Sequence, residues 1–68
     1  MTVNSKLLRD IIASKGLKQK FIADKIGISE DYLSKKIAGS LLFKKDEAKK
    51  LQDVLALSDS EMLHIFLD

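Results

Sequence analysis

The chain has 68 residues, of which 46% are hydrophobic and 32% are charged, and its net charge is +2. This length accommodates one small domain, residues 1–68, and the composition is typical of a folded chain. Because the sequence has no cysteine and a single histidine, it excludes a disulfide framework and a Cys/His zinc site. No apolar run approaches the roughly 20 residues that span a bilayer, so we expect no membrane partner and no targeting segment. Because no cysteine points to an oxidising compartment, we expect a cytoplasmic location.

Charge is distributed unevenly along the chain. Residues 1–41 contain eight basic and four acidic side chains, a net charge of +4, whereas residues 42–68 contain four basic and six acidic side chains, a net charge of −2. The N-terminal part is therefore the better candidate to face a polyanion such as nucleic acid. Lysines that only solvate helix surfaces are the alternative interpretation.

Hydrophobic residues recur at helical spacing in five segments, and little in the sequence favours strands. Thr2 or Asn4 can cap the first segment and Ser29 the third. The expected helices are residues 4–15, 18–25, 30–38 and 45–56, and a fifth that starts at the capping box Ser58-Asp59-Ser60-Glu61. The sequence therefore predicts an all-α domain.

The second and third segments meet the requirements of a helix-turn-helix. Gly27 supplies the positive φ that a tight turn needs, Ala23 lets the two helices cross closely, and Ile28 fills the corner between them. The small core that sets their angle is formed by Ile22, Ile26, Leu33 and Ile37.

Residues 19–39, QKFIADKIGISEDYLSKKIAG, resemble the helix-turn-helix of the Cro/CI-type (XRE) repressor family. The helix order, the Glu47-Ala48 opening of the fourth helix and the Leu55-Ala56-Leu57-Ser58 passage extend a coarser resemblance over nearly the whole chain. The resemblance implies a compact five-helix repressor-like DNA-binding domain of phage or prophage type. It further implies binding to double-stranded operator DNA in a bacterial host cell, commonly as a homodimer and without a cofactor.

The resemblance also implies which residues contact DNA. Gln19 matches the family position at the start of the second helix that usually holds a phosphate. The positions that reach base edges are matched by Ser29, Glu30, Asp31, Ser34 and Lys35. For Glu30 and Asp31, stabilisation of the helix N-terminus without any base contact is an open alternative.

Helical periodicity leads independently to a similar surface. At about 100° per residue, one arc of the helix lies opposite Leu33 and Ile37. The residues on this arc are Glu30, Asp31, Ser34, Lys35 and Ala38. The flanking side chains that we expect to contact phosphates are Lys18, Tyr32 and Lys36.

Apolar residues near the C-terminus predict a dimer interface. Ile65, Phe66 and Leu67 are consecutive, and one helical face cannot cover all three, while Leu41 and Leu42 add apolar surface in a loop. The alternative is a helix end folded back on the core.

Three functional hypotheses follow. The first is a DNA-binding transcriptional regulator that acts as a repressor, the second is the antitoxin of a toxin–antitoxin pair, and the third is a helical protein-interaction module without DNA binding. An enzyme, a metal site and a small-molecule substrate are not expected, because the sequence offers no nucleophile with a base, and His64 lacks partners at ligand spacing.

Overall fold

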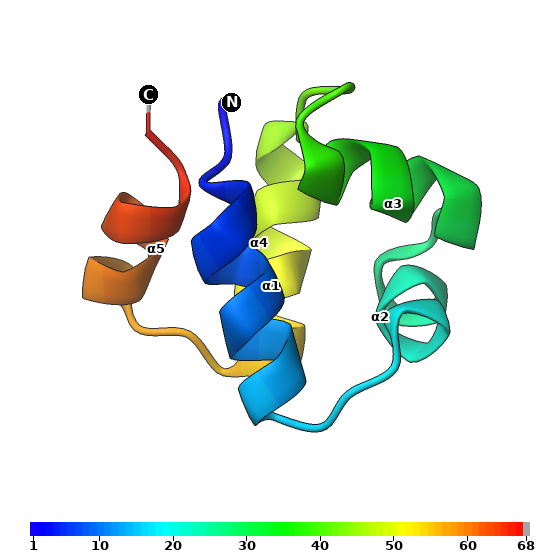
Figure 1. The fold of residues 1–68 in the computed structure, drawn as a ribbon, viewed down its shortest axis with the longest axis horizontal. Coiled ribbons are helices and arrows are strands. Elements are labelled where there is room, and N and C mark those ends of the chain that lie inside the picture. The colour runs from blue at the N-terminus through cyan, green and yellow to red at the C-terminus, as the bar shows by residue number, and fades with distance from the viewer. Residues whose placement is uncertain (68) are drawn as a thin grey trace.

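Five helices make up the computed structural model, which describes residues 1–67 (Figure 1). They are α1 (Ser5–Ser14), α2 (Gln19–Ile26), α3 (Glu30–Ala38), α4 (Lys45–Leu55) and α5 (Asp59–Ile65). The only β pairing among the described residues is one antiparallel bridge between Val3 and Phe66. The all-α prediction is confirmed. None of these helices is long and apolar enough to cross a lipid bilayer.

The helices surround one core. In Figure 1, α1 lies in front of α4, with α5 on one side and the α2–α3 pair on the other. Close packing joins α2 to both α3 and α4, and joins α1 to α3 and α5. Every helix contributes to the buried hydrophobic set, which is Leu8, Ile22, Ala23, Ile26, Leu33, Ile37, Phe43, Ala48, Leu51, Leu55, Leu57, Ile65 and Phe66. Burial of each large member stabilises the fold by about 1.5 to 3 kcal/mol.

Local sequence features set most of the helix ends. The Asn4 side chain accepts from the Leu7 amide at 3.2 Å, and the Ser29 hydroxyl accepts from the Tyr32 amide at 3.2 Å. Ser58 and Glu61 form the predicted capping box, in which each side chain accepts from the backbone amide of the other residue. By contrast α2 follows Lys18, which provides no side-chain cap.

The turn between α2 and α3 has the predicted conformation. Gly27 lies in the left-handed region at φ 81° and ψ 30°, and its amide donates to the Ala23 carbonyl at 2.9 Å. The Ile28 amide donates to the same carbonyl at 3.1 Å, which closes the end of α2. Ala23 is buried and α2 packs against α3, so the two helices and the tight glycine turn expected from the sequence are present.

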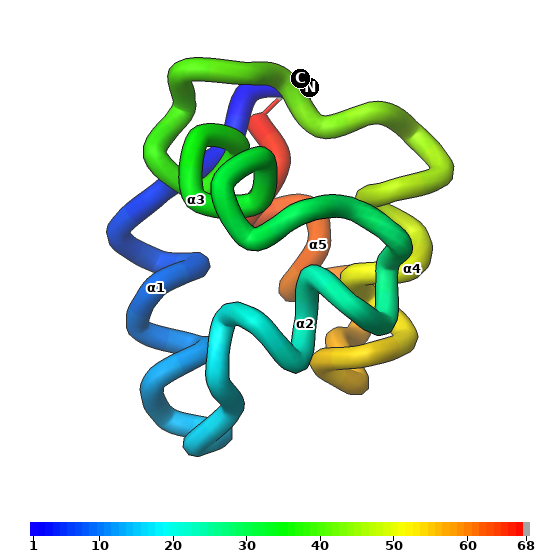
Figure 2. The backbone as a smooth tube through the Cα atoms, turned by 90° about the vertical axis from the view of Figure 1, so that its right-hand side faces the viewer, coloured from blue at the N-terminus to red at the C-terminus, as the bar shows by residue number. Residues whose placement is uncertain are grey.

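The start of the chain lies beside the last residues that the structure describes, as both Figure 1 and Figure 2 show. The Asn4 amide donates to the Ile65 carbonyl at 2.7 Å, and the Leu67 amide donates to the Thr2 carbonyl at 3.0 Å. These bonds pair the end of the chain with its start. Phe66 lies between them and has extended rather than helical backbone angles, φ −105° and ψ 115°.

This pairing makes the predicted exposure of Ile65 and Phe66 wrong. Both are buried, and the Phe66 ring packs edge-on against Phe43 with 5.4 Å between ring centroids. The expectation assumed a helix continuing through these residues, whereas extended backbone turns Phe66 inward and leaves Leu67 outside, 61% exposed. Leu63, which the sequence analysis did not select, is 77% exposed on α5.

We expect Gly27→Val to lower stability by about 1 to 3 kcal/mol, because a β-branched residue is strained at positive φ. An added Cβ would meet no neighbouring atom within 4 Å, so no overlap at the Cβ itself adds to the backbone strain. Gly27→Asn is the matched control and should lose less, since Asn tolerates the left-handed region. Thermal unfolding followed by circular dichroism measures the stability of both variants. Equal melting temperatures for Gly27→Val and wild type would contradict the left-handed conformation of Gly27.

Candidate nucleic-acid interface

The outer face of α3 carries most of the predicted base-contacting residues. Leu33 and Ile37 point into the core, and the opposite arc of the helix is open to solvent. The exposed polar residues on this side, together with the cap that precedes it, are Ser29, Glu30, Asp31, Ser34 and Lys35. The structure therefore brings together the side chains that the sequence selected for base contacts.

A side-chain hydrogen bond connects this face to the start of α2. The Gln19 amide nitrogen, Nε2, donates to the Ser34 hydroxyl oxygen across the interhelical angle. Gln19 is the first residue of α2 and Ser34 lies in the middle of α3, so the bond holds the two side chains together at the surface. The predicted phosphate contact and one predicted base contact are thus neighbours.

The start of α2 is suited to bind an anion. Lys18 precedes the helix and is exposed, and its side chain does not cap the first backbone amides of α2. Uncapped amides and the helix dipole favour negative charge at this end. A phosphate beside Lys18 and Gln19 would supply the acceptor that the helix lacks.

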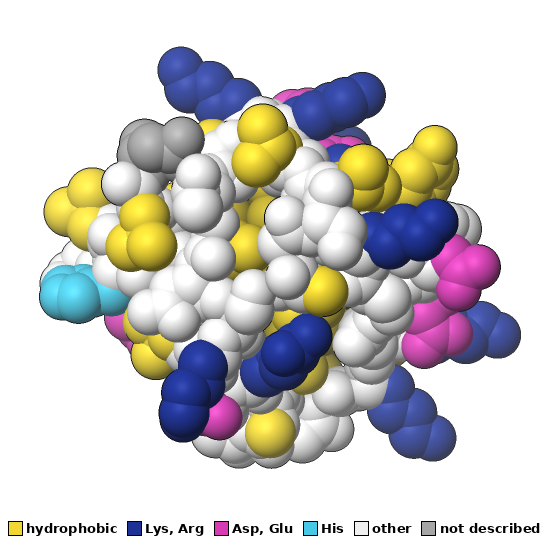
Figure 3. Space-filling view, turned by 45° about the horizontal axis from the view of Figure 1, so that its top comes forward, with side chains coloured by type: hydrophobic (Ala, Val, Ile, Leu, Met, Phe, Trp, Pro, Cys, Tyr) yellow, Lys and Arg dark blue, Asp and Glu magenta, His cyan; other side chains and the backbone are white. Residues whose placement is uncertain are grey.

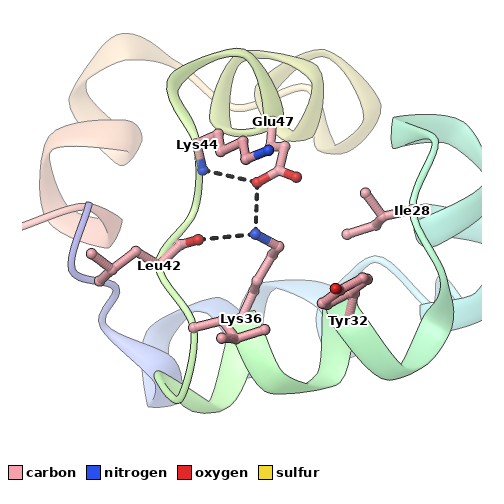
Figure 4. A pocket seen from close by; sticks show the side chains of 7 residues that line it. Ile28, Tyr32, Lys36, Leu42, Lys44 and Glu47 are labelled. Atoms are coloured by element: carbon pink, nitrogen blue, oxygen red, sulfur yellow. Dashed lines mark hydrogen bonds and ion pairs between the residues drawn. The ribbon is translucent and has the colours of Figure 1, made fainter.

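Lys36 does not lie at the surface, so its prediction as a phosphate contact is wrong. Its side chain is only 8% exposed, and its Nζ lies 2.9 Å from Glu47 Oε1 and 2.9 Å from the Leu42 carbonyl oxygen (Figure 4). One turn after Leu33 and next to Ile37, Lys36 faces α4 rather than solvent. Its lysine stem packs inward while the ammonium meets an internal carboxylate.

Glu47 completes this buried cluster. Its Oε1 also accepts from the Lys44 backbone amide at 2.8 Å, which closes the first turn of α4. Burial alone would raise the pKa of the Glu47 carboxyl, but the Lys44 amide and the hydrogen bond and charge of Lys36 outweigh it and hold the pKa below its ordinary value. The carboxylate therefore stays charged in its pair with Lys36 at neutral pH.

A pocket of about 340 Å³ lies above this ion pair. Lys36, Lys44 and Glu47 form its polar side, and Ile28 and Tyr32 lie across from them (Figure 4). Leu41 and Leu42 complete the apolar rim and are exposed, as the sequence analysis expected for this loop. Tyr32 is also exposed and points away from the Ser34 side of α3, so it flanks the predicted base-contacting surface.

Figure 3 shows lysine and arginine side chains at the edges and across the lower part of one face, with hydrophobic side chains reaching the surface between them. Among residues 1–67 no group of three or more His, Cys, Asp or Glu side chains is placed to hold a metal ion. His64 is exposed on α5, and its Nδ1 lies 2.8 Å from the Ser60 carbonyl oxygen.

Comparisons of the chain with models of protein families, with curated proteins and with solved structures find no match. The functional hypotheses therefore rest on the residues and their geometry.

We expect Glu47→Gln to lower stability at neutral pH by about 1.5 to 3 kcal/mol, the usual contribution of a hydrogen bond to a charged group. Because the pKa of Glu47 is lower in the folded than in the unfolded state, its stabilisation is fully present above the unfolded pKa of about 4.3. It is lost as the pH falls through the folded-state pKa, so the difference between variant and wild type should shrink in acid.

Urea unfolding between pH 7 and pH 3 measures this difference. The matched control is Asp46→Asn, which removes an exposed carboxylate from the same turn of α4. A pH-independent difference for Glu47→Gln would show that the charge of Glu47 does not stabilise the fold.

Proposed function

We propose that this chain is a sequence-specific DNA-binding transcriptional regulator that places α3 in the major groove of operator DNA and acts as a repressor. The observation that carries the proposal is the outer face of α3. Asp31, Ser34 and Lys35 are exposed there, while Leu33 and Lys36 attach the opposite side of the same helix to the domain. A helix that packs on its domain through one side and exposes hydrogen-bonding groups on the other can enter the major groove and contact base edges.

The size of α3 supports this role. Its nine residues form a rod about 13 Å long, and a helix with side chains is about 10 to 12 Å across. The major groove is about 12 Å wide and 8.5 Å deep, so it admits one exposed helix. Phosphates on one side of the groove would then approach Lys18, Gln19 and the uncapped amides of α2.

A contact between two copies through α5 would be compatible with DNA binding. Leu63 on α5 and Leu67, two residues after α5, are exposed. α5 lies on the opposite side of the domain from α3 (Figures 1 and 2). A dimer formed through α5 leaves both copies of α3 uncovered. Two half-sites, each read by one copy, would multiply the specificity of a single short helix.

The second candidate function is a protein-interaction module. The observations that favour it are the acidic residues Glu30 and Asp31 on the outer face of α3 and the exposed apolar side chains of Tyr32 and Leu42 beside the pocket. Carboxylates repel phosphates, whereas apolar rims suit protein partners. Selection of bound duplexes from a random DNA pool separates the two functions, because an interaction module would enrich no sequence.

We expect Lys18→Ala to weaken binding to all DNA sequences alike, because phosphate contacts carry no sequence information. The slope of log affinity against log salt should become shallower by about 0.9 for one lost phosphate contact. Lys36→Met is the contrasting variant: folded protein should keep the wild-type slope, because this lysine is bound internally to Glu47. Fluorescence anisotropy at several salt concentrations measures both, and an unchanged slope for Lys18→Ala would place the phosphates elsewhere.

We expect Leu63→Lys and Leu67→Lys to yield folded monomers that bind a two-half-site operator more weakly than wild type. Phe66→Lys should instead unfold the domain, because it places a charge in the core beside Phe43. Sedimentation equilibrium and circular dichroism distinguish these outcomes. A wild-type protein that stays monomeric at high micromolar concentration, free and on DNA, would rule out the dimer.

A further inference from the structure

A hollow of about 200 Å³ on the surface of α3 is bordered by Asp31 and Lys35, with Ser29 and Tyr32 beside them. Residues four apart on a helix are neighbours, with about 5 to 6 Å between their Cβ atoms. One carboxylate and one ammonium group therefore border the same exposed hollow.

Asp31 and Lys35 are not paired with each other. The ion pairs within residues 1–67 are Lys6 with Asp10 and Lys36 with Glu47. Both members of the Asp31–Lys35 couple thus keep their hydrogen-bonding capacity for an external partner. The couple offers an acceptor and a donor side by side.

The other polar residues of the exposed arc are less suited to read a base. The hydroxyl of Ser34 already accepts from Gln19, is uncharged and does not border the hollow, and Glu30 does not border the hollow either. Ala38, at the end of the arc, has no polar group. Asp31 and Lys35 are therefore the two charged side chains that the hollow presents to a base edge.

The major-groove edge of a G·C base pair complements this couple. Guanine presents two acceptors, N7 and O6, which a lysine ammonium contacts together, and cytosine presents the N4 amino donor, which a carboxylate accepts. Four residues rise about 6 Å along a helix, less than two base-pair steps of about 3.4 Å. The two contacts thus fall on one base pair or on adjacent pairs.

Resting on the proposed function, we infer that Asp31 and Lys35 together determine specificity for guanine–cytosine pairs in the operator. Lys35 donates to N7 and O6 of a guanine. Asp31 accepts from N4 of a cytosine in the same or the adjacent pair. Glu30, one residue before Asp31, acts on the helix dipole and does not read a base.

Selection from a random duplex pool, carried out with wild type and variants, tests the inference. The wild-type motif should contain G·C pairs at one or two positions per half-site. Lys35→Met should reduce the preference for guanine at one position by about 5- to 150-fold. Asp31→Asn should shift a cytosine position towards adenine, because Asn binds adenine N6 and N7.

Two control variants remove comparable charges without touching the couple. Glu30→Gln removes the neighbouring carboxylate, and Lys18→Met removes a lysine assigned to phosphate. Both should change overall affinity and leave the selected motif as it is.

Modified bases locate the contact of Lys35 at the level of atoms. Replacing the selected guanine by 7-deazaguanine removes N7 and should weaken wild type while leaving Lys35→Met unaffected. Inosine keeps the same major-groove edge, so wild type should bind it as it binds guanine.

The outcomes separate this inference from the proposal on which it rests. If wild type enriches a motif but Asp31→Asn and Lys35→Met select the same motif, the inference is overturned and DNA binding stands. If wild type enriches no motif, the proposed function is overturned and the inference falls with it.

Discussion

One buried ion pair links α3 to α4 on the inner side of α3. Lys36 on α3 and Glu47 on α4 lie 2.9 Å apart, and the same two side chains bind the Leu42 carbonyl and the Lys44 amide of the connecting loop. Removing both charges from water costs free energy that only close geometry and satisfied hydrogen bonds offset. The pair therefore favours one orientation of α3 relative to α4, which supplements the less directional packing of Leu33 and Ile37.

Because α3 packs on the domain through one side, its opposite side is exposed to solvent. The turn at Gly27 sets the angle between α2 and α3. Gln19 reaches across the turn to Ser34, so the start of α2 and the middle of α3 form one polar surface. The proposed division of roles follows from this arrangement: residues at the start of α2 hold phosphate, and Asp31 with Lys35 reads bases. On the far side of the domain, Leu63 and Leu67 are exposed, and we propose that a second copy binds there.

Features set by neighbouring residues could be predicted from the sequence. Local signals fix the turn and the caps: Gly27, Ser29 and the Ser58–Glu61 capping box each act within one helical turn. The helix ends predicted from the amphipathic period differ from the observed ends by at most one residue. The burial of Lys36 and Phe66 could not be predicted, because it depends on contacts with residues that are distant in the sequence. Lys36 lies beside the apolar stripe of α3, where only the approach of Glu47 makes burial favourable, and Phe66 turns inward because the segments around Asn4 and Ile65 pair. A lysine next to a core position, followed by a glutamate at the start of the next helix, was the signal for the ion pair.

The most direct test of the central claim is a titration of ¹⁵N-labelled protein with a selected duplex, followed through backbone amide chemical shifts. The account predicts that the largest changes occur at the start of α2, around Lys18 and Gln19, and along the exposed side of α3, around Asp31 and Lys35. It also predicts that duplex with a shuffled sequence perturbs the α2 amides more than those of α3. Changes confined to α1 and α5, or none at a concentration of duplex that saturates binding, would contradict the placement of α3 in the major groove.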